Sequence, residues 1–302
     1  MCYPRARGTW KEGRHLVGRG ELTEEAWRVI APLLPASGRG GQWRDHRTVI
    51  NGILWKLRTG APWRDLPERY GPWQTCADRL YRWRRDGTWD RILAHVQTKS
   101  DAVGEIVWEV SLDSSTARAH QHASGARHRP SQADKKGVQH PADEGLGRSR
   151  GGLTTKFHLA CDGRGRPLSV VITPGQRHDS TQLGPVLDGI RVPRPGGRGR
   201  PRTRPDRVIA DKGYSYPRCR RLLCQRQIPH TIPERRDQRE QRATRPGRPL
   251  AFDPAIYARR NVVERCINRL KQWRGLATRY EKRAVNYRAM VVISSIIMWL
   301  ES

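Results

Sequence analysis

The chain has 302 residues, enough for a sizeable core in one large domain or in a large domain with a smaller companion. Its 58 lysines and arginines outnumber its 29 acidic residues and leave a formal net charge of +29. That surplus predicts binding to nucleic acid that weakens steeply with salt. Arginine makes up 49 of the 58 basic residues, which favours bidentate phosphate contacts, although a GC-rich coding sequence would raise arginine regardless of function.

Several classes of protein are excluded by the ends of the chain and by its cysteines. Residues 1–21 are basic but lack the apolar segment of a signal peptide, so we expect a disordered basic arm. The most apolar stretch, 290–300, is too short to span a bilayer and is expected to form a buried terminal helix. The six cysteines lack paired CxxC spacing, which favours reduced thiols in a cytosolic protein.

Residues 22–100 are predicted to form a small helical domain, because apolar residues recur there at helical spacing. The expected helices cover residues 24–34, 46–57, 73–83 and 89–96. Glycines and prolines interrupt the pattern between residues 60 and 72, which indicates a connecting loop.

The segment 74–85 is the candidate recognition helix of a helix-turn-helix that binds DNA, because it is rich in arginine. The residues expected to contact DNA are Arg79, Arg82, Arg84 and Arg85. The alternative is a helical bundle that only packs against the rest of the chain or mediates dimerisation.

The first strand is expected at 106–112, where apolar and polar residues alternate with a period of two. Asp113 follows at the end of this strand and is expected to point away from the core. Taken alone, an aspartate in this position is more often a capping or surface residue than a metal ligand.

From residue 101 onward, strands alternate with helices, which predicts an α/β fold with a mixed sheet flanked by helices. Further strands are expected at 154–160, 168–173, 207–210 and 228–232, and helices at 181–190, 216–227 and 254–273. Basic loops near 191–205 and 234–249 are expected to be solvated, with DNA contact as the second interpretation.

Two further acids lie in turns between these elements. Asp211 ends the short apolar run 207–210, and Gly213 permits a sharp exit from that strand, so Asp211 is equally well explained as a turn residue. Asp179 follows the 168–173 strand, where a helix cap formed by Asp179 or Ser180 is the simplest account.

The helix expected at 254–273 carries the most specific pattern. Four side chains spaced 3, 4 and 7 residues apart fall within roughly 60° of one another on the helix surface: Tyr257, Arg260, Glu264 and Lys271. An apolar face lies about 100° away, so the helix can dock on one face and present Glu264 to a cleft. The alternative is an exposed charged face with an ordinary i,i+4 ion pair.

Three carboxylates gathered in one site repel each other and need a cation between them. Mg²⁺ prefers oxygen ligands, and two such ions about 3.5 to 4 Å apart can clamp the attacking and leaving oxygens of a phosphoryl displacement. The sequence therefore predicts Asp113, Asp211 and Glu264 as catalytic residues and as ligands of two Mg²⁺ ions, for which Mn²⁺ can substitute.

These motifs resemble those of bacterial DDE transposases, in the IS4/IS5-like group named after insertion sequence five. The family's Tyr-x2-Arg-x3-Glu-x6-Lys signature is matched without a gap from Tyr257 to Lys271. Its Asp-Ser-(Ser/Thr) motif is matched at 113–115 and its Ala-Asp-Lys-Gly-Tyr motif at 210–214. The resemblance extends over nearly the whole chain from Leu22 onward.

The resemblance implies an RNase H-like (retroviral integrase-type) catalytic core over 101–302. In that fold the first two acids lie on neighbouring strands and the third lies on a helix that crosses them. It also implies an enzyme that cuts DNA at the ends of an insertion sequence and joins them to target DNA. The expected partners are the terminal inverted repeats and target DNA, bound by a homodimer or a higher synaptic assembly.

Within this interpretation, we expect Arg260 and Lys271 to contact phosphates of the bound DNA end and Tyr257 to pack against that end. Two alternatives use the same residues differently. An RNase H-type nuclease would cut without strand transfer, and a catalytically inactive relic would bind DNA and cut nothing.

Overall fold

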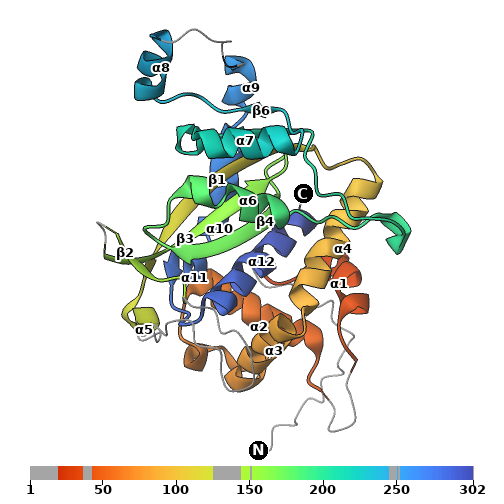
Figure 1. Ribbon diagram of the computed structural model, residues 1–302. Helices are drawn as coiled ribbons and strands as arrows, with labels where there is room; N and C mark the ends of the chain where they lie inside the picture. The colour runs from red at the N-terminus through yellow and green to blue at the C-terminus, as the bar shows by residue number, and fades with distance from the viewer. Residues whose placement is uncertain are drawn as a thin grey trace, which may run out of the picture.

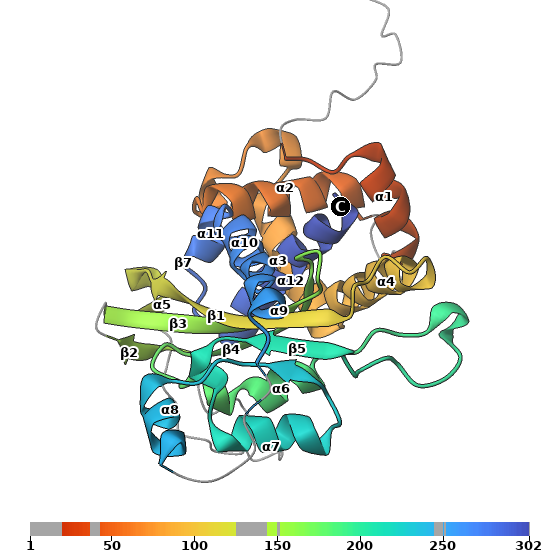
Figure 2. The ribbon, with the colours of Figure 1, turned by 90° about the horizontal axis from the view of Figure 1, so that it is seen from above.

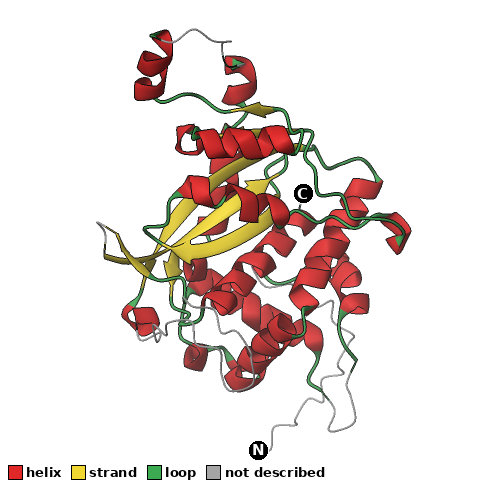
Figure 3. Cartoon of the chain, in the orientation of Figure 1, coloured by secondary structure: helices red, strands yellow, loops and turns green. Residues whose placement is uncertain are grey.

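A central mixed sheet with helices on both faces forms the body of this protein, as the computed structural model shows (Figure 1, Figure 3). The structure describes residues 20–36, 43–124, 144–149, 152–244, 250 and 252–301. The predicted basic arm therefore lies almost wholly outside the described residues, as does the end of the second basic loop.

The N-terminal part is helical, and its helices begin close to where the apolar periodicity places them. They are α1 (Glu24–Ile30), η1 (Ala31–Leu33), α2 (His46–Thr59), η2 (Trp63–Asp65), η3 (Glu68–Tyr70), α3 (Trp73–Arg85) and α4 (Thr88–Ala102). Asp45 caps α2 by accepting the backbone N–H of Thr48 at 2.7 Å. Gly60 ends the same helix with φ 69°, a left-handed conformation that favours glycine.

Seven strands form the sheet: β1 (Glu109–Ala119), β2 (Gly147–Ser149), β3 (Gly152–Cys161), β4 (Pro167–Pro174), β5 (Arg207–Ala210), β6 (His230–Thr231) and β7 (Thr278–Arg279). Their order is β2-β3-β1-β5-β6, with β4 paired to β3 and β7 paired to β1. Strand β1 is antiparallel to β3 and parallel to β5, so the sheet is mixed as expected.

The remaining helices connect or cover these strands. They are α5 (Gln121–Ser124), η4 (Asp179–Thr181), α6 (Leu183–Asp188), η5 (Pro195–Gly197), η6 (Lys212–Tyr214), α7 (Pro217–Gln225), α8 (Arg236–Ala243), α9 (Pro254–Ala258), α10 (Asn261–Lys271), α11 (Arg274–Ala277) and α12 (Ala284–Leu300). Viewed from above, α1, α2, α3, α10, α11 and α12 lie on one side of the sheet, and α6, α7 and α8 lie on the other (Figure 2).

Two expectations about these elements were wrong. The first strand does not end before Asp113 but continues to Ala119, because the polar residues 114–118 pair with β3. The helix expected at 254–273 is interrupted at 259–260, where Arg260 and Val262 donate backbone hydrogen bonds to residues three positions earlier. Tyr257 and Glu264 therefore lie on two consecutive helices.

The sheet separates two buried apolar clusters, and β1 contributes to both. Val110 and Leu112 pack in the cluster with α6 and α7, whereas Ala117 packs in the cluster with α10 and α12. Because side chains alternate along a strand, Asp113 lies on the α10 side of the sheet and Ser114 lies on the α7 side.

The N-terminal helices pack in the same apolar cluster as α10 and α12. Between the two parts, Arg288 of α12 pairs with Asp90 of α4 at 2.9 Å, and the Arg58 guanidinium lies 5.0 Å from the Trp273 ring. The two parts are thus one packed body. Over the described residues, no helix is both long enough and apolar enough to cross a bilayer.

Candidate active site

Asp113 and Asp211 are brought together by the pairing of two parallel strands. Leu112 of β1 lies opposite Ala210 of β5, and each aspartate is the next residue along its own strand direction. Since neighbouring strands lie about 4.8 Å apart, the register places the two aspartates side by side. The Asp211 carboxylate also accepts the backbone N–H of Gly213 at 2.9 Å and so caps the short helix η6.

Glu264 lies on α10, which packs against β1 and β3 through its buried face. That face is the apolar one predicted from the sequence: Val263, Cys266, Ile267 and Leu270 are all buried. Glu264 lies on the neighbouring face, with 52% of its side chain exposed.

Arg260 joins the first and third acids. One guanidinium nitrogen donates to Asp113 Oδ2 at 2.6 Å, and the other terminal nitrogen donates to Glu264 Oε1 at 2.7 Å. Both bonds are charge-assisted and short, so the guanidinium is held between the two carboxylates. Burial lowers the pKa of Arg260, but Asp113, Tyr257 and Asp211 together raise it above its usual value.

The environment of Asp113 raises the pKa of its carboxyl. Burial raises the pKa of the carboxyl above its usual range, and Asp211 and Asp179 raise it further. The Arg260 guanidinium and the backbone N–H of Ser114, which Asp113 accepts at 2.8 Å, act in the opposite direction. The net shift of the pKa is upward. A positive charge beside Asp113 lowers this pKa and so stabilises the carboxylate.

A fourth acid, which the sequence predicted only as part of a helix cap, lies on the other face of β1. Asp179 accepts from Ser114 Oγ at 2.9 Å and pairs with Lys156 Nζ at 2.9 Å. His158 is buried beside it, with Nδ1 3.6 Å from the same carboxylate. The expected helix cap by Asp179 or Ser180 was wrong, because the His178 side chain accepts the Ser180 N–H instead.

The other residues of the predicted stripe lie around the acids in different ways. The Tyr257 ring packs against Phe252 with centroids 5.5 Å apart, and the pKa of its hydroxyl is raised by burial and by Asp211, Glu264 and Asp113, although Arg260 lowers it. Lys271 is the last residue of α10, about two turns beyond Glu264, where it is half-buried.

The four arginines predicted on the α3 surface are not equivalent. Arg82 and Arg85 are exposed and Arg84 is half-buried. Arg79 is only 7% exposed, because its guanidinium stacks 4.2 Å from the Trp43 ring centroid and lies 2.8 Å from His46 Nδ1. Arg79 thus packs inside the helical part and has little surface left for DNA.

The donor chemistry at this site suits a hard divalent cation, because it consists of carboxylate oxygens on two strand ends and one helix. As the side chains are placed, however, no three His, Cys, Asp or Glu residues within the described ranges lie close enough together to hold a metal ion. A positively charged guanidinium lies between Asp113 and Glu264 instead. In this structure Arg260 therefore supplies the positive charge that a bound metal ion would supply between these two carboxylates.

Two family matches cover most of the chain. Residues 22–93 match the family described as "Putative transposase of IS4/5 family", and residues 108–299 match the family described as "Transposase DDE domain". The first match covers the helical part, and the second covers the sheet together with Asp113, Asp211 and Glu264.

Several curated proteins are similar over part of the chain. The "Putative transposase for insertion sequence element IS402" of Burkholderia cepacia is 37% identical over 146 residues, which is 48% of this chain and 63% of that protein. The "Putative transposase for insertion sequence element IS6501" of Brucella ovis is 29% identical over 49% of this chain and 99% of its own length. The "Uncharacterized protein y4sN" of Sinorhizobium fredii is 37% identical over 35% of this chain and 82% of its own length.

No solved structure gave a significant match. The match over residues 108–299 spans more than half of the chain, and it includes the two strand ends and the helix that carry Asp113, Asp211 and Glu264. Enzymes of this family act on DNA and depend on divalent metal ions. The chain belongs to the DDE transposase family, in the IS4/IS5-like group, and is a DNA transposase.

Proposed function

We propose that Asp113, Asp211 and Glu264 are the three catalytic acids and that together they hold the divalent cations, two Mg²⁺ ions for which Mn²⁺ can substitute. The observation that carries this proposal is the Arg260 guanidinium bound at 2.6 and 2.7 Å by the first and third acids. Three acids of this kind are stable together only around positive charge, and in this structure Arg260 supplies it.

For Asp113 and Glu264 to hold a metal ion between them, Arg260 would have to leave its present position. Mg²⁺ bound by carboxylates polarises phosphoryl oxygens and lowers the pKa of coordinated water, which is the chemistry that strand cleavage and rejoining need. The carboxylates of Asp113, Asp211 and Glu264 must then all be ionised. Arg260 is free at that point to bind a phosphate of the DNA end, as its bidentate geometry favours.

The DNA end is proposed to lie along α9 and α10. Lys271 contacts a phosphate beyond the acids, and Tyr257 packs against the end or hydrogen-bonds to it. Support comes from their places on either side of Glu264, with Tyr257 on α9 and Lys271 at the last turn of α10.

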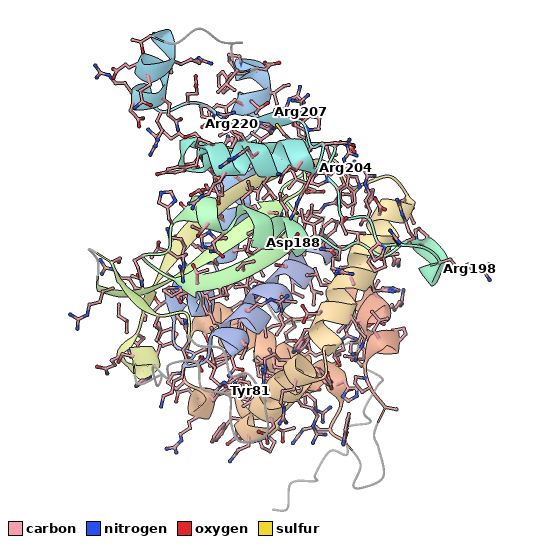
Figure 4. All side chains as sticks on the ribbon, in the orientation of Figure 1. Tyr81, Asp188, Arg198, Arg204, Arg207 and Arg220 are labelled. Carbon is pink, nitrogen blue, oxygen red and sulfur yellow. The ribbon has the colours of Figure 1, made fainter. Side chains whose placement is uncertain are left out.

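A second DNA contact is proposed for the helical part. Arg82, Arg84 and Arg85 lie at the C-terminal end of α3, which a short turn at Asp86 and Gly87 joins to α4. We propose that this end of α3 contacts DNA in the manner of a helix-turn-helix, without Arg79. The basic loop 191–205 is a further candidate, since Arg198 projects from the body of the molecule there (Figure 4).

We also propose a specific fold and domain organisation for this chain. An RNase H-like core over 101–302, preceded by a DNA-binding helical domain over 22–100, is supported by two acids on or just after neighbouring strands and a third on a helix that packs against β1 and β3. We also propose a homodimer or larger assembly, because transposition joins two element ends. The net charge of +29 supports association with the nucleoid.

The test is cleavage and strand transfer of labelled element ends by purified Asp113→Asn, Asp211→Asn and Glu264→Gln variants with Mg²⁺. Each variant is expected to lose at least about a thousandfold in rate while its affinity for the end is kept. Asp188→Asn is the matched control, because Asp188 pairs with Arg226 on the far side of the sheet and is 64% exposed (Figure 4). Wild-type cleavage by any of the three variants would refute the assignment.

A further inference from the structure

A second site lies away from the acids, in a cavity of about 770 Å³. The end of α2, the loop that follows it, α3, the residues after β1 and the residues after β7 all contribute to its lining. Tyr81 of α3, which lines it, lies in the lower helical part of the molecule (Figure 4). The volume is that of a small-molecule site and is large enough for a nucleobase with its sugar.

The walls of this cavity are aromatic. They include Trp63, Tyr81, Tyr280 and His120. The His120 and Tyr280 rings lie 4.9 Å apart with an interplanar angle of 37°, and the His122 ring lies edge-on to His120 at 4.6 Å with an angle of 65°. Rings arranged in this way offer flat surfaces on which another planar ring can stack.

A buried ammonium group points into the same space. Lys56 is only 4% exposed, and its Nζ lies 5.4 Å from the Tyr280 ring centroid and 5.9 Å from that of Trp63. Burial lowers the pKa of Lys56, and the charge of Glu281 acts on it in the opposite direction. Among the described residues, Lys56 has this electrostatic partner but no hydrogen-bond acceptor, so its ammonium hydrogens are available to a ligand.

A carboxylate stands across from this ammonium group. Glu281 lines the cavity and accepts from Tyr81 Oη at 3.3 Å and from Asn286 Nδ2 at 3.4 Å. The cavity therefore presents a donor and an acceptor between aromatic walls. Carbonyl oxygens, ring nitrogens and exocyclic amines of a nucleobase match that combination, whereas a plain hydrocarbon does not.

The surroundings of the cavity are basic. Lys282 and Arg283 are exposed beside it, and Arg84 lies near enough to Arg283 that their mutual repulsion, after burial, lowers the pKa of Arg84. Like charges gathered at the rim of a cavity are stabilised by a polyanion, which points to the phosphate backbone of DNA.

We propose that this cavity receives an unpaired base of the DNA substrate, stacked between the aromatic walls and hydrogen-bonded by Lys56 and Glu281. The site goes beyond the acids that carry the phosphoryl chemistry. His120 follows β1, seven residues after Asp113, so the cavity lies about 23 Å from the acids along the strand. DNA that spans from the acids to the arginines of α3 passes its rim.

The test measures binding of the full chain to two duplexes of the same sequence, one fully paired and one with a single unpaired 5-iododeoxyuridine. The duplex with the unpaired base is expected to bind roughly tenfold more tightly than the fully paired duplex, as stacking of one base on aromatic side chains allows. Irradiation is expected to crosslink the base to Trp63, Tyr81 or Tyr280, located by mass spectrometry.

Two variants give the matched comparison. Lys56→Met removes the buried charge while keeping the stem of the side chain, and Tyr280→Leu removes one wall. In both variants, the ratio of the affinities for the unpaired and the fully paired duplex is expected to fall close to one. Lys99→Met, which removes an exposed charge on α4, is expected to keep the preference.

Three results would overturn the proposal. They are an unchanged preference in both variants, crosslinks only to residues outside the cavity, and binding of free deoxyadenosine monophosphate without any preference for the unpaired base in DNA. The last result would identify a free-nucleotide site. Asp113→Asn is expected to keep the preference, so a failure here is distinct from a failure of the catalytic assignment.

Discussion

The two faces of β1 hold their carboxylates in different ways. On the α10 side, Asp113 shares a single cation with Glu264, and that cation is an arginine side chain from a helix break. On the α7 side, Asp179 is fixed by Ser114 and Lys156, with His158 buried beside it. The difference teaches that two kinds of charge pairing stand on one strand. In the proposed function the α10 side exchanges its arginine for metal, whereas the network on the α7 side keeps its partners and supports the strand.

The largest effect on stability is expected from the fixed face. Asp179→Ala leaves Lys156, which is 16% exposed, without its partner and removes the acceptor of Ser114. We expect the free energy of unfolding to fall by about 2 to 3 kcal/mol, measured by urea denaturation. The control is Asp206→Ala, which removes a surface pair with Arg202 in which Asp206 is 73% exposed, and should cost less than about 1 kcal/mol. Equal losses in both variants would contradict a fixed network.

The second prediction concerns pH on the same face. Burial lowers the pKa of His158 to about 4, with Asp179 raising it and Lys156 lowering it further. The unfolded chain, with an ordinary histidine, takes up a proton near pH 6.5, so His158 makes stability fall as the pH drops from about 6.5 to about 4. The His158→Gln variant can keep the bond to Thr173. Between pH 6.5 and 4, its free energy of unfolding should fall by on the order of 2 kcal/mol less than that of the wild type.

The measurement is urea denaturation at a series of pH values, with His122→Gln as the control because His122 is exposed. Parallel pH curves for wild type and His158→Gln would show that His158 is not held neutral by the fold.

The third prediction concerns the face that exchanges its charge. Arg260→Gln removes the cation between Asp113 and Glu264, so without metal the acids repel each other and Mg²⁺ has no side chain to displace. We expect roughly tenfold tighter Mg²⁺ binding, about 1.4 kcal/mol, measured by calorimetry on the DNA-free protein. Arg259→Gln is the control, since Arg259 is 62% exposed and pairs with Glu109 instead. Unchanged or weaker Mg²⁺ binding by the Arg260 variant would mean that the guanidinium does not occupy the place of the metal.

The smallest effect is expected at the end of α10. Lys271→Ala should weaken binding of an element end about fivefold and reduce the slope of its salt dependence by about one charge, because one phosphate contact is lost. Fluorescence anisotropy over a salt series measures both. Lys99→Ala on α4 provides the control. Wild-type binding and cleavage by the Lys271 variant would make the stripe on α10 structural only.

Local patterns predicted much of the fold and of the proposed site. The strand 207–210 has the predicted bounds, and the apolar face of α10 follows from its spacing, because both depend on residues close in sequence. The extension of β1 through polar residues was missed because its pairing with β3 is a contact between distant segments. The hydrogen bond between Ser114 and Asp179 was missed for the same reason, because the two residues are 65 positions apart.

The packing of Arg79 could not be predicted either. An arginine on a basic helix suggests a surface residue, and only the fold shows Trp43, His46 and Trp83 around it. Burial of the guanidinium on aromatic rings depends on which helices meet, and helical periodicity alone does not contain that information.

The register between β1 and β5 determines where this enzyme can tolerate insertions and deletions. The spacing of its first two acids is set by a short backbone ladder, from Glu109 opposite Arg207 to Leu112 opposite Ala210. The long excursion between those strands can therefore gain or lose residues at its surface without altering that spacing. The protruding turn at Pro195–Gly197 is such a place, and a fluorophore or affinity tag inserted there would leave the acids where they are.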